Sequence, residues 1–455
     1  MSFPRYAAYK DSGVEWLGSV PEEWDVLPLK AVATCNDEVL PELTDSDKVI
    51  EYLEISGVSE GRGITQTETL TFGSAPSRAR RVIKHGDVLI STVRTYLRAI
   101  ASVSHPPENL IASTGFAAIR PRRVHPGYLG YLLHCEYLIA EVIARSVGIS
   151  YPAINASDLM GLKGPSPTIE EQQAIATFLD RETTKIDALV EEQRRLIDLL
   201  KEKRQAVISQ AVTKGLNPNV PMKDSGVAWL GRVPAHWRTT RVKRVARDGR
   251  RTFVDGDWIE LPFITADGVR LLQCGNVGTG VFEEQGYRYI SEETFKELDC
   301  TEVEPNDVLI CRLQSSRTIL AGRACLAPDL GTKMVTSVDN CIVKPSAEFD
   351  PAYVVLQLST PAYLSFIEVV ARGGTRDRIS RSQLASIEIA APPLDEQRAI
   401  VEIVQRDAVQ IDALVSEASL AMDLLQERRS ALVSAAVTGK IDVRGLVPQA
   451  EAIAA

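Results

Sequence analysis

Donor-rich side chains flank two short apolar runs of the sequence, GDVLI at 86–90 and NDVLI at 306–310. They are Arg78, Arg80, Arg81, Arg94, Tyr96 and Arg98 around the first run, and Gln314 and Arg317 after the second. Arginine presents forked donors that match guanine edges and phosphates, and glutamine and tyrosine can donate or accept at base edges. The chemistry that these residues favour is binding to nucleic acid.

Two further loops carry the same chemistry. A turn at Gly148–Tyr151 ends in Tyr151, and its counterpart in the second half is RGGTRDRISR at 372–381, which contains Arg376 and Arg378. A solvated surface remains an alternative for any single cluster. Clusters at equivalent places in both halves favour binding. The basic runs at 78–81 and 238–251 are expected to contact mainly phosphates.

Catalytic motifs are missing from the sequence. It has no phosphate-binding G-x4-G-K-[ST] loop, no GxSxG elbow, no HExxH and no Asn/Asp-Pro-Pro-aromatic motif. The seven Cys form no CxxC pair and the five His are scattered, so no metal site is predicted. We interpret the chain as non-catalytic, with buried thiols in a reducing cytoplasm and no signal peptide or membrane span.

Length and charge set broad limits. The 455 residues, 45% hydrophobic and 24% charged, are typical of a folded protein of about three domains. The formal net charge of −9 alone argues mildly against nucleic-acid binding. A basic face can nevertheless exist on an acidic protein.

The elements that must position these loops occur twice. KDSGVEWLG at 10–18 returns as KDSGVAWLG at 223–231, and each is followed by a VPxxW segment. IDALV at 186–190 returns unchanged at 411–415. Because the matching segments keep their order and the spacing drifts only from 213 to 225 residues, the chain is a tandem duplication. The two halves are expected to superpose by a near two-fold rotation.

Each half ends in a long predicted helix with apolar residues at heptad spacing. The seam residues are Ile175, Leu179, Ile186, Leu189, Leu196 and Leu200, and then Ile400, Val404, Ile411, Leu414 and Leu425. Thr168 and Glu171 fit a capping box, and Gly215 and Gly439 are expected to end the helices. Each helix would be about 65 Å long, and the two stripes predict an antiparallel coiled coil.

The segments before the helices alternate short β-branched runs with turns, which predicts two α/β domains with mixed sheets. Helices are expected within 128–144 and 351–371. The predicted parts are a first domain (1–165), a first helix (166–215), a second domain (216–391), a second helix (392–440) and a tail (441–455).

These motifs resemble the DNA-specificity subunit of type I restriction-modification systems. The resemblance rests on the KDSGVEWLG–VPxxW opening, on Glu171-Gln172 and Glu396-Gln397 at the helix starts, and on the Ala-Val-Thr helix ends. It implies two target-recognition domains that each read one half of a bipartite double-stranded DNA site. It also implies that the helices dock two methyltransferase subunits, with restriction (translocase) subunits completing the complex. S-adenosylmethionine, ATP and Mg²⁺ would be bound by those partners and none by this chain.

Two other functions are considered. A coiled-coil scaffold for proteins, without a DNA role, would also carry two globular domains on paired helices. A self-sufficient methyltransferase or nuclease is disfavoured by the missing motifs.

Overall fold

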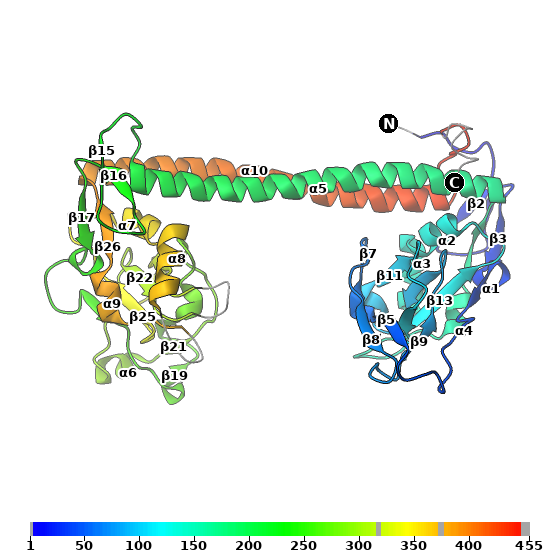
Figure 1. Cartoon of the computed structure of the whole chain (residues 1–455), viewed down its shortest axis with the longest axis horizontal. Helices are drawn as coiled ribbons and strands as arrows, with labels where there is room; N and C mark the ends of the chain where they lie inside the picture. The colour runs from blue at the N-terminus through cyan, green and yellow to red at the C-terminus, as the bar shows by residue number, and fades with distance from the viewer. Residues whose placement is uncertain (1–2, 315–319, 372–376, 447–455) are drawn as a thin grey trace. The chain divides into compact units, whose positions relative to one another are not determined.

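The computed structural model describes residues 3–314, 320–371 and 377–446, in two compact units. Unit 1 is Met1–Gln193 with Ser419–Ala455, and unit 2 is Arg194–Ala418. Helices α5 (Ile169–Lys214) and α10 (Leu394–Val437) each contribute residues to both units. Each unit therefore combines one α/β domain with a stretch of both long helices (Figure 1).

Two four-stranded sheets form the first domain. The antiparallel sheet has the order β11 (Ile100–Ser102), β10 (Val88–Ser91), β13 (Phe116–Pro121), β4 (Ala33–Cys35). The mixed sheet has the order β8 (Glu68–Thr71), β5 (Val49–Leu53), β12 (Leu110–Ser113), β9 (Ala79–Val82), in which β5 and β12 are parallel. Two-stranded pairs complete it: β1 (Tyr9–Asp11) with β2 (Ser19–Pro21), β3 (Asp25–Pro28) with β14 (Lys163–Ser166), and β6 (Val58–Ser59) with β7 (Gly63–Ile64).

The second domain repeats this plan. Its antiparallel sheet is β18 (Phe253–Asp255), β25 (Asn340–Val343), β22 (Val308–Cys311), β23 (Ala324–Leu326). Its mixed sheet is β19 (Ile264–Thr265), β21 (Tyr289–Ile290), β20 (Val269–Leu272), β24 (Met334–Thr336), with β20 parallel to β24. The pairs are β15 (Met222–Asp224) with β16 (Arg232–Pro234), and β17 (Arg238–Arg241) with β26 (Glu388–Ala391). The predicted tandem α/β domains are confirmed.

Short helices cover the sheets. In the first domain they are α1 (Leu29–Val32), α2 (Pro126–Leu133), α3 (Glu136–Ala144) and α4 (Ala156–Met160), with 3-10 turns η1 (Ile55–Gly57) and η2 (Thr95–Leu97). In the second they are α6 (Glu292–Glu297), α7 (Pro351–Gln357), α8 (Pro361–Val370) and α9 (Arg381–Ser386), with η3 (Val242–Arg244), η4 (Leu261–Phe263) and η5 (Cys274–Asn276). The segments 128–144 and 351–371, each expected to contain a helix, are each split into two helices. Of the helices described, none is by itself long and apolar enough for a membrane span. The bent pair α7–α8 together has the required length and apolar composition.

The aspartate of the repeated Asp-Val-Leu-Ile segment is buried in both domains. Asp87 accepts hydrogen bonds from the Arg120 Nε and Nη2 atoms, each at 2.8 Å, and from the Lys84 amide. Asp307 lies 3.2 Å from the Lys344 Nζ atom and accepts a bond from the Glu304 amide. A buried carboxylate requires such partners because burial disfavours its charge. The repeated aspartate therefore has a structural role in the core of each domain.

The long helices run antiparallel within each unit. In unit 1, Ile175 and Leu179 of α5 share one apolar core with Val433 and Val437 near the end of α10. In unit 2, the end of α5 packs against the start of α10, so the two helices are again antiparallel. The residues of this contact are Ala211 and Val212 of α5 with Ile400, Val401 and Val404 of α10. The antiparallel coiled coil is thus present in both units.

Some residues that were predicted to lie in the buried seam between the long helices are exposed instead. Leu189, Leu196 and Leu414 are 45%, 42% and 49% exposed, whereas the neighbouring Val190 is buried. The other seam residues are buried, or half-buried at Leu425. A heptad alternates steps of three and four residues between buried positions. In α5 the steps of four residues begin at Leu179, Ile186 and Gln193. Both phases fit the apolar sequence, and packing of the partner helix selects between them. The prediction of burial was wrong for these three leucines.

Two equivalent ion pairs join the long helices. In unit 1, Arg429 of α10 donates to Asp187 of α5, with 3.1 Å between nitrogen and oxygen. In unit 2, Arg204 of α5 donates to Asp412 of α10, also at 3.1 Å. The roles of the two helices are exchanged between the units, as an internal repeat requires. Exposed pairs of this kind stabilise by about 0.2–1 kcal/mol each.

The repeated tryptophan lies beneath the end of a long helix. In unit 1, Trp24 is fully buried and donates through Nε1 to Glu171 at 3.0 Å, and the Tyr6 hydroxyl donates to the same carboxylate at 2.6 Å. Gly439 ends α10 with φ +75°, and a Cβ there would lie 2.3 Å from Pro21. Thr168 accepts from the Glu171 amide as predicted, but the Glu171 carboxylate holds the tryptophan instead.

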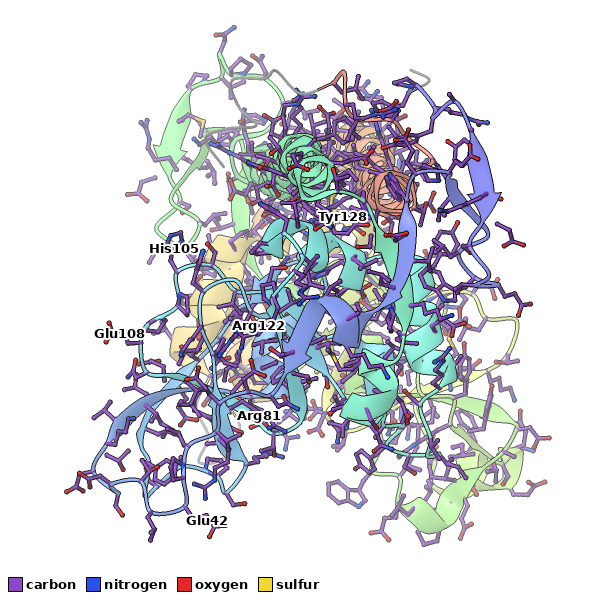
Figure 2. All side chains as sticks on the ribbon, turned by 90° about the vertical axis from the view of Figure 1, so that its right-hand side faces the viewer. Glu42, Arg81, His105, Glu108, Arg122 and Tyr128 are labelled. Atoms are coloured by element: carbon purple, nitrogen blue, oxygen red, sulfur yellow. The ribbon has the colours of Figure 1, made fainter. Side chains whose placement is uncertain are left out.

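The glutamine of each Glu-Gln motif links its domain to the start of the long helix by hydrogen bonds. Gln172 donates to the Pro167 carbonyl and accepts from the His125 amide, both at 2.8 Å. Gln397 makes the equivalent bonds with Pro392 and Asp350, both at 2.9 Å. Tyr128, labelled just beneath the helices in Figure 2, donates to the Pro165 carbonyl at 2.9 Å. The Glu-Gln motifs and Trp24, which contribute to the resemblance, therefore have structural roles.

Candidate nucleic-acid interface

Two loops of the first domain form one surface. The loop after β10 and the turn at 147–153 are joined by bonds from the Arg94 amide to the Pro152 carbonyl (2.7 Å) and from the Ile154 amide to the Thr92 carbonyl (2.9 Å). The Thr95 and Ser146 hydroxyls meet at 2.8 Å. The sequence singled out these loops separately, and the fold brings them together.

The second domain joins its loops in the same way. The Gln314 amide donates to the Asp377 carbonyl and the Ile379 amide to the Arg312 carbonyl, both at 2.9 Å. These bonds occupy the positions of the Arg94–Pro152 and Ile154–Thr92 bonds in the first domain. Two of the predicted residues, Arg317 and Arg376, lie outside the described residues.

Arg94 stacks on an exposed aromatic ring. Its guanidinium carbon lies 4.6 Å from the centre of the Tyr151 ring, and Tyr151 is 64% exposed. Arg94 adopts the left-handed conformation (φ 51°). Stacking uses the flat face of the guanidinium, so its N–H donors point outward along the edge. A rigid fork of donors beside Tyr151 and the exposed Tyr96 suits a base edge.

Three other predicted arginines have carboxylate partners. Arg98 bonds to Glu136 at 2.6 and 2.9 Å and to Glu60 at 3.1 Å, and the Glu136 hydrogen bond raises the pKa of Arg98. Arg78 pairs with Glu54, and Arg378 with Asp339 at 2.8 Å. In each pair the carboxylate occupies part of the guanidinium and offsets its charge. The geometry favours a role in positioning the loops.

Arg80 and Arg81 belong to a strand rather than a loop. Both lie in β9 and are only partly exposed. Arg80 lies over the Phe72 ring at 4.8 Å and donates to the Ser77 carbonyl. Burial lowers the pKa of Arg81. They are poorly placed to enter a groove of DNA.

Exposed apolar residues of both domains were not predicted from the sequence, because that prediction rests on hydrogen-bond donors. In the first domain, Val147 and Ile149 are highly exposed beside Tyr151. In the second, Trp258, Leu261 and Tyr287 are exposed. Their only signal in the sequence was their position in turns.

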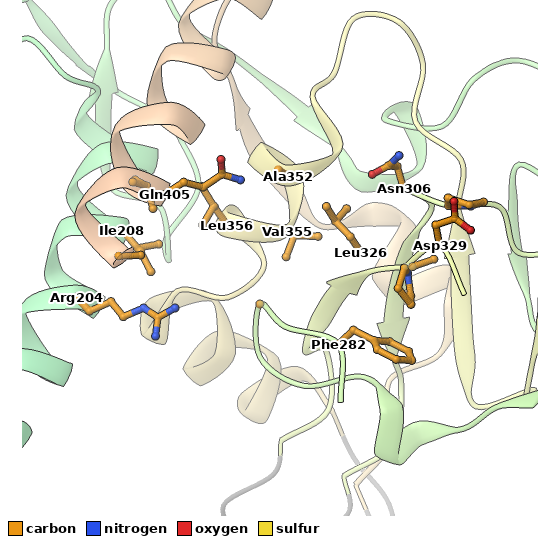
Figure 3. Close-up of a pocket in the computed structure, with 16 residues that line it drawn as sticks. Arg204, Ile208, Phe282, Asn306, Leu326, Asp329, Ala352, Val355, Leu356 and Gln405 are labelled. Atoms are coloured by element: carbon orange, nitrogen blue, oxygen red, sulfur yellow. The ribbon is translucent and has the colours of Figure 1, made fainter. Parts of the chain in front are cut away.

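Unit 2 contains a cavity of about 470 Å³ between its domain and its long helices (Figure 3). Leu356, Gln405 and Ala408 line it. The repeat places Tyr131, Asp180 and Thr183 at these positions in unit 1, where the Tyr131 hydroxyl bonds to Asp180 at 2.7 Å and to Thr183 at 3.1 Å. Unit 2 has Leu356 and Ala408 where unit 1 has the larger Tyr131 and Thr183, so this hydroxyl cluster is missing there.

Transplanting the three unit 1 residues should recreate their hydrogen-bonded cluster at the wall of this cavity. We expect the triple variant Leu356→Tyr, Gln405→Asp, Ala408→Thr to be more stable by about 0.5–2 kcal/mol, because the new tyrosine hydroxyl gains the two hydrogen-bond partners that Tyr131 has in unit 1. Urea unfolding of the purified chain measures this. Leu356→Tyr alone serves as the control and should gain less, since its hydroxyl lacks the aspartate. Equal or lower stability of the triple variant would contradict the equivalence.

Each unit thus joins an α/β domain to antiparallel helices, and in each domain backbone hydrogen bonds join two loops that contain hydrogen-bond donors. Residues 21–197 and 275–411 match the family described as "Type I restriction modification DNA specificity domain". A putative type I restriction enzyme specificity subunit of Methanocaldococcus jannaschii is 24% identical over 445 residues, covering 94% of this chain and 96% of that protein.

Solved structures show the same fold. A chain from a structure of a type I R-M system, described in terms of complex assembly and conformational transition, aligns with a TM-score of 0.71 and 22% identity, covering 94% of this chain and 99% of the other. The HsdS subunit of Thermoanaerobacter tengcongensis aligns with a TM-score of 0.52 and 21% identity, covering 93% and 98%. The chain belongs to the family of type I restriction-modification DNA specificity domains.

Proposed function

We propose that this chain is the non-catalytic specificity subunit of a type I complex, and that its two domains (1–165 and 216–391) each read one half of a bipartite DNA target. The observation that carries the proposal is the contrast between the copies. Motifs that hold the helices and domains together are retained, whereas the loops after β10 and β22 differ, STVRTYLR against CRLQSSR. Different loops on one scaffold suit different half-sites.

The long helices offer a docking surface for the modification subunits. Leu189 of unit 1 and Leu414 of unit 2 are exposed at equivalent positions of the repeat, and so are Leu424 and Leu199. Exposed leucines at equivalent positions of both units suit two copies of the same partner. On this proposal, S-adenosylmethionine, ATP and Mg²⁺ belong to the modification and restriction partners.

Adenine-methylation mapping of DNA from cells that express the chain with its modification subunits tests the proposal. We expect one bipartite motif, because both half-sites are read by domains of a single chain. A coiled-coil scaffold without a DNA role predicts no motif and no binding of the assembled complex to duplex DNA. That result would refute the proposal.

A further inference from the structure

The turn after α3 projects a large apolar side chain into solvent. Ile149 is fully exposed, at the tip of the turn that carries Tyr151. Gly148 has φ +121°, and a Cβ there would lie 3.0 Å from the Tyr151 carbonyl oxygen, so the turn requires glycine. Reciprocal backbone bonds between Val147 and Ala153, at 2.9 and 3.0 Å, close its base. The position of Ile149 is therefore fixed by a closed turn.

This tip lies next to the Arg94 fork. Tyr151, two residues after Ile149, carries the Arg94 guanidinium on its ring, and Pro152 accepts from the Arg94 amide. A duplex that offers a base edge to Arg94 therefore brings neighbouring base edges close to Ile149. Of the groups displayed in the major groove, the C5-methyl of thymine is the apolar one, and the minor groove lacks it.

We propose that Ile149 contacts the C5-methyl group of a thymine in the first half-site and helps to determine specificity there. The inference rests on the proposed function and extends it to a residue without hydrogen-bonding groups. Burying a methyl group against an apolar side chain corresponds to about a fourfold gain in affinity. The contact selects thymine over cytosine and over uracil.

Uracil substitution tests the contact directly, because uracil differs from thymine only by that methyl group. The complex of the full chain with its modification subunits is titrated with duplexes in which each thymine of the first half-site is replaced in turn. We expect one replacement to weaken binding by the wild-type complex about fourfold. The Ile149→Ala complex should bind the thymine and uracil duplexes equally at that position, and Ile149→Val should keep part of the difference.

Leu43→Ala is the matched control, since Leu43 is 97% exposed in another loop of the same domain. It should keep the full uracil effect. A half-site without thymine, a wild-type complex insensitive to every replacement, or an Ile149→Ala complex that keeps its sensitivity would each overturn the inference. All three can occur while the complex still reads a bipartite target. Failure of the proposed function would instead appear as a wild-type complex without a motif.

Discussion

Leu189→Glu is expected to abolish stable assembly with one modification subunit while leaving the chain folded. The leucine is already exposed in unit 1, so the charge stays in water in the free chain. In the proposed interface the same carboxylate would be buried against an apolar surface without a partner, at a cost of several kcal/mol. Leu414→Glu should act equally on the second subunit, and the double variant should bind neither. Size-exclusion chromatography with light scattering measures the stoichiometry.

The neighbouring residue provides the contrast. Val190 is buried in the helix seam, so Val190→Glu should destabilise the chain itself by several kcal/mol, visible as a lower midpoint of urea unfolding. Leu189→Glu should keep the wild-type midpoint. If Leu189→Glu lowers the midpoint and Val190→Glu does not, the seam has the phase first predicted from sequence. Should Leu189→Glu retain both modification subunits, the docking surface lies elsewhere.

The helices were predictable from the sequence, whereas the phase of their contact was not. Apolar residues recur at heptad spacing in two adjacent columns, one through Leu189 and Leu196 and the other through Val190 and Ile197. A lone helix provides no reason to choose between them. The choice follows from the opposing helix, which places Arg429 beside Asp187. Long-range packing of this kind cannot be deduced from local periodicity.

The position of the candidate interface was predictable from the sequence, whereas the roles of its individual residues were less so. Because the repeated Asp-Val-Leu-Ile strands mark equivalent places, the sequence located the loops that follow them. It could not reveal that Glu136 and Glu60, each 38 residues from Arg98, meet that arginine. Donor content alone also missed Ile149, since an apolar tip acts through exposure, which depends on the folded turn.

Arg94→Ala is expected to relax one base position of the first half-site and to leave the second half-site unchanged. The stacked, outward-facing fork of Arg94 is suited to a guanine edge, and losing such a pair costs about 1–3 kcal/mol, or roughly five- to 150-fold in discrimination. The second half-site is expected to depend on unit 2, which contains Gln314 and none of the loops around Arg94. Methylation mapping of cells carrying the variant shows both effects at once.

Arg145→Ala is the control that distinguishes a loss of base recognition from a general loss of positive charge. Arg145 lies at the end of α3 near the same turn, is about half exposed and pairs with Glu141, four residues earlier. Its removal should leave the motif intact. If Arg94 contacts only phosphate, Arg94→Ala will weaken binding evenly across sequences and lower the salt dependence by about one ion, without relaxing any position. Such an even loss would move base reading in the first domain away from Arg94, toward the exposed Tyr96 and Tyr151, whose rings and hydroxyls remain on the same double loop.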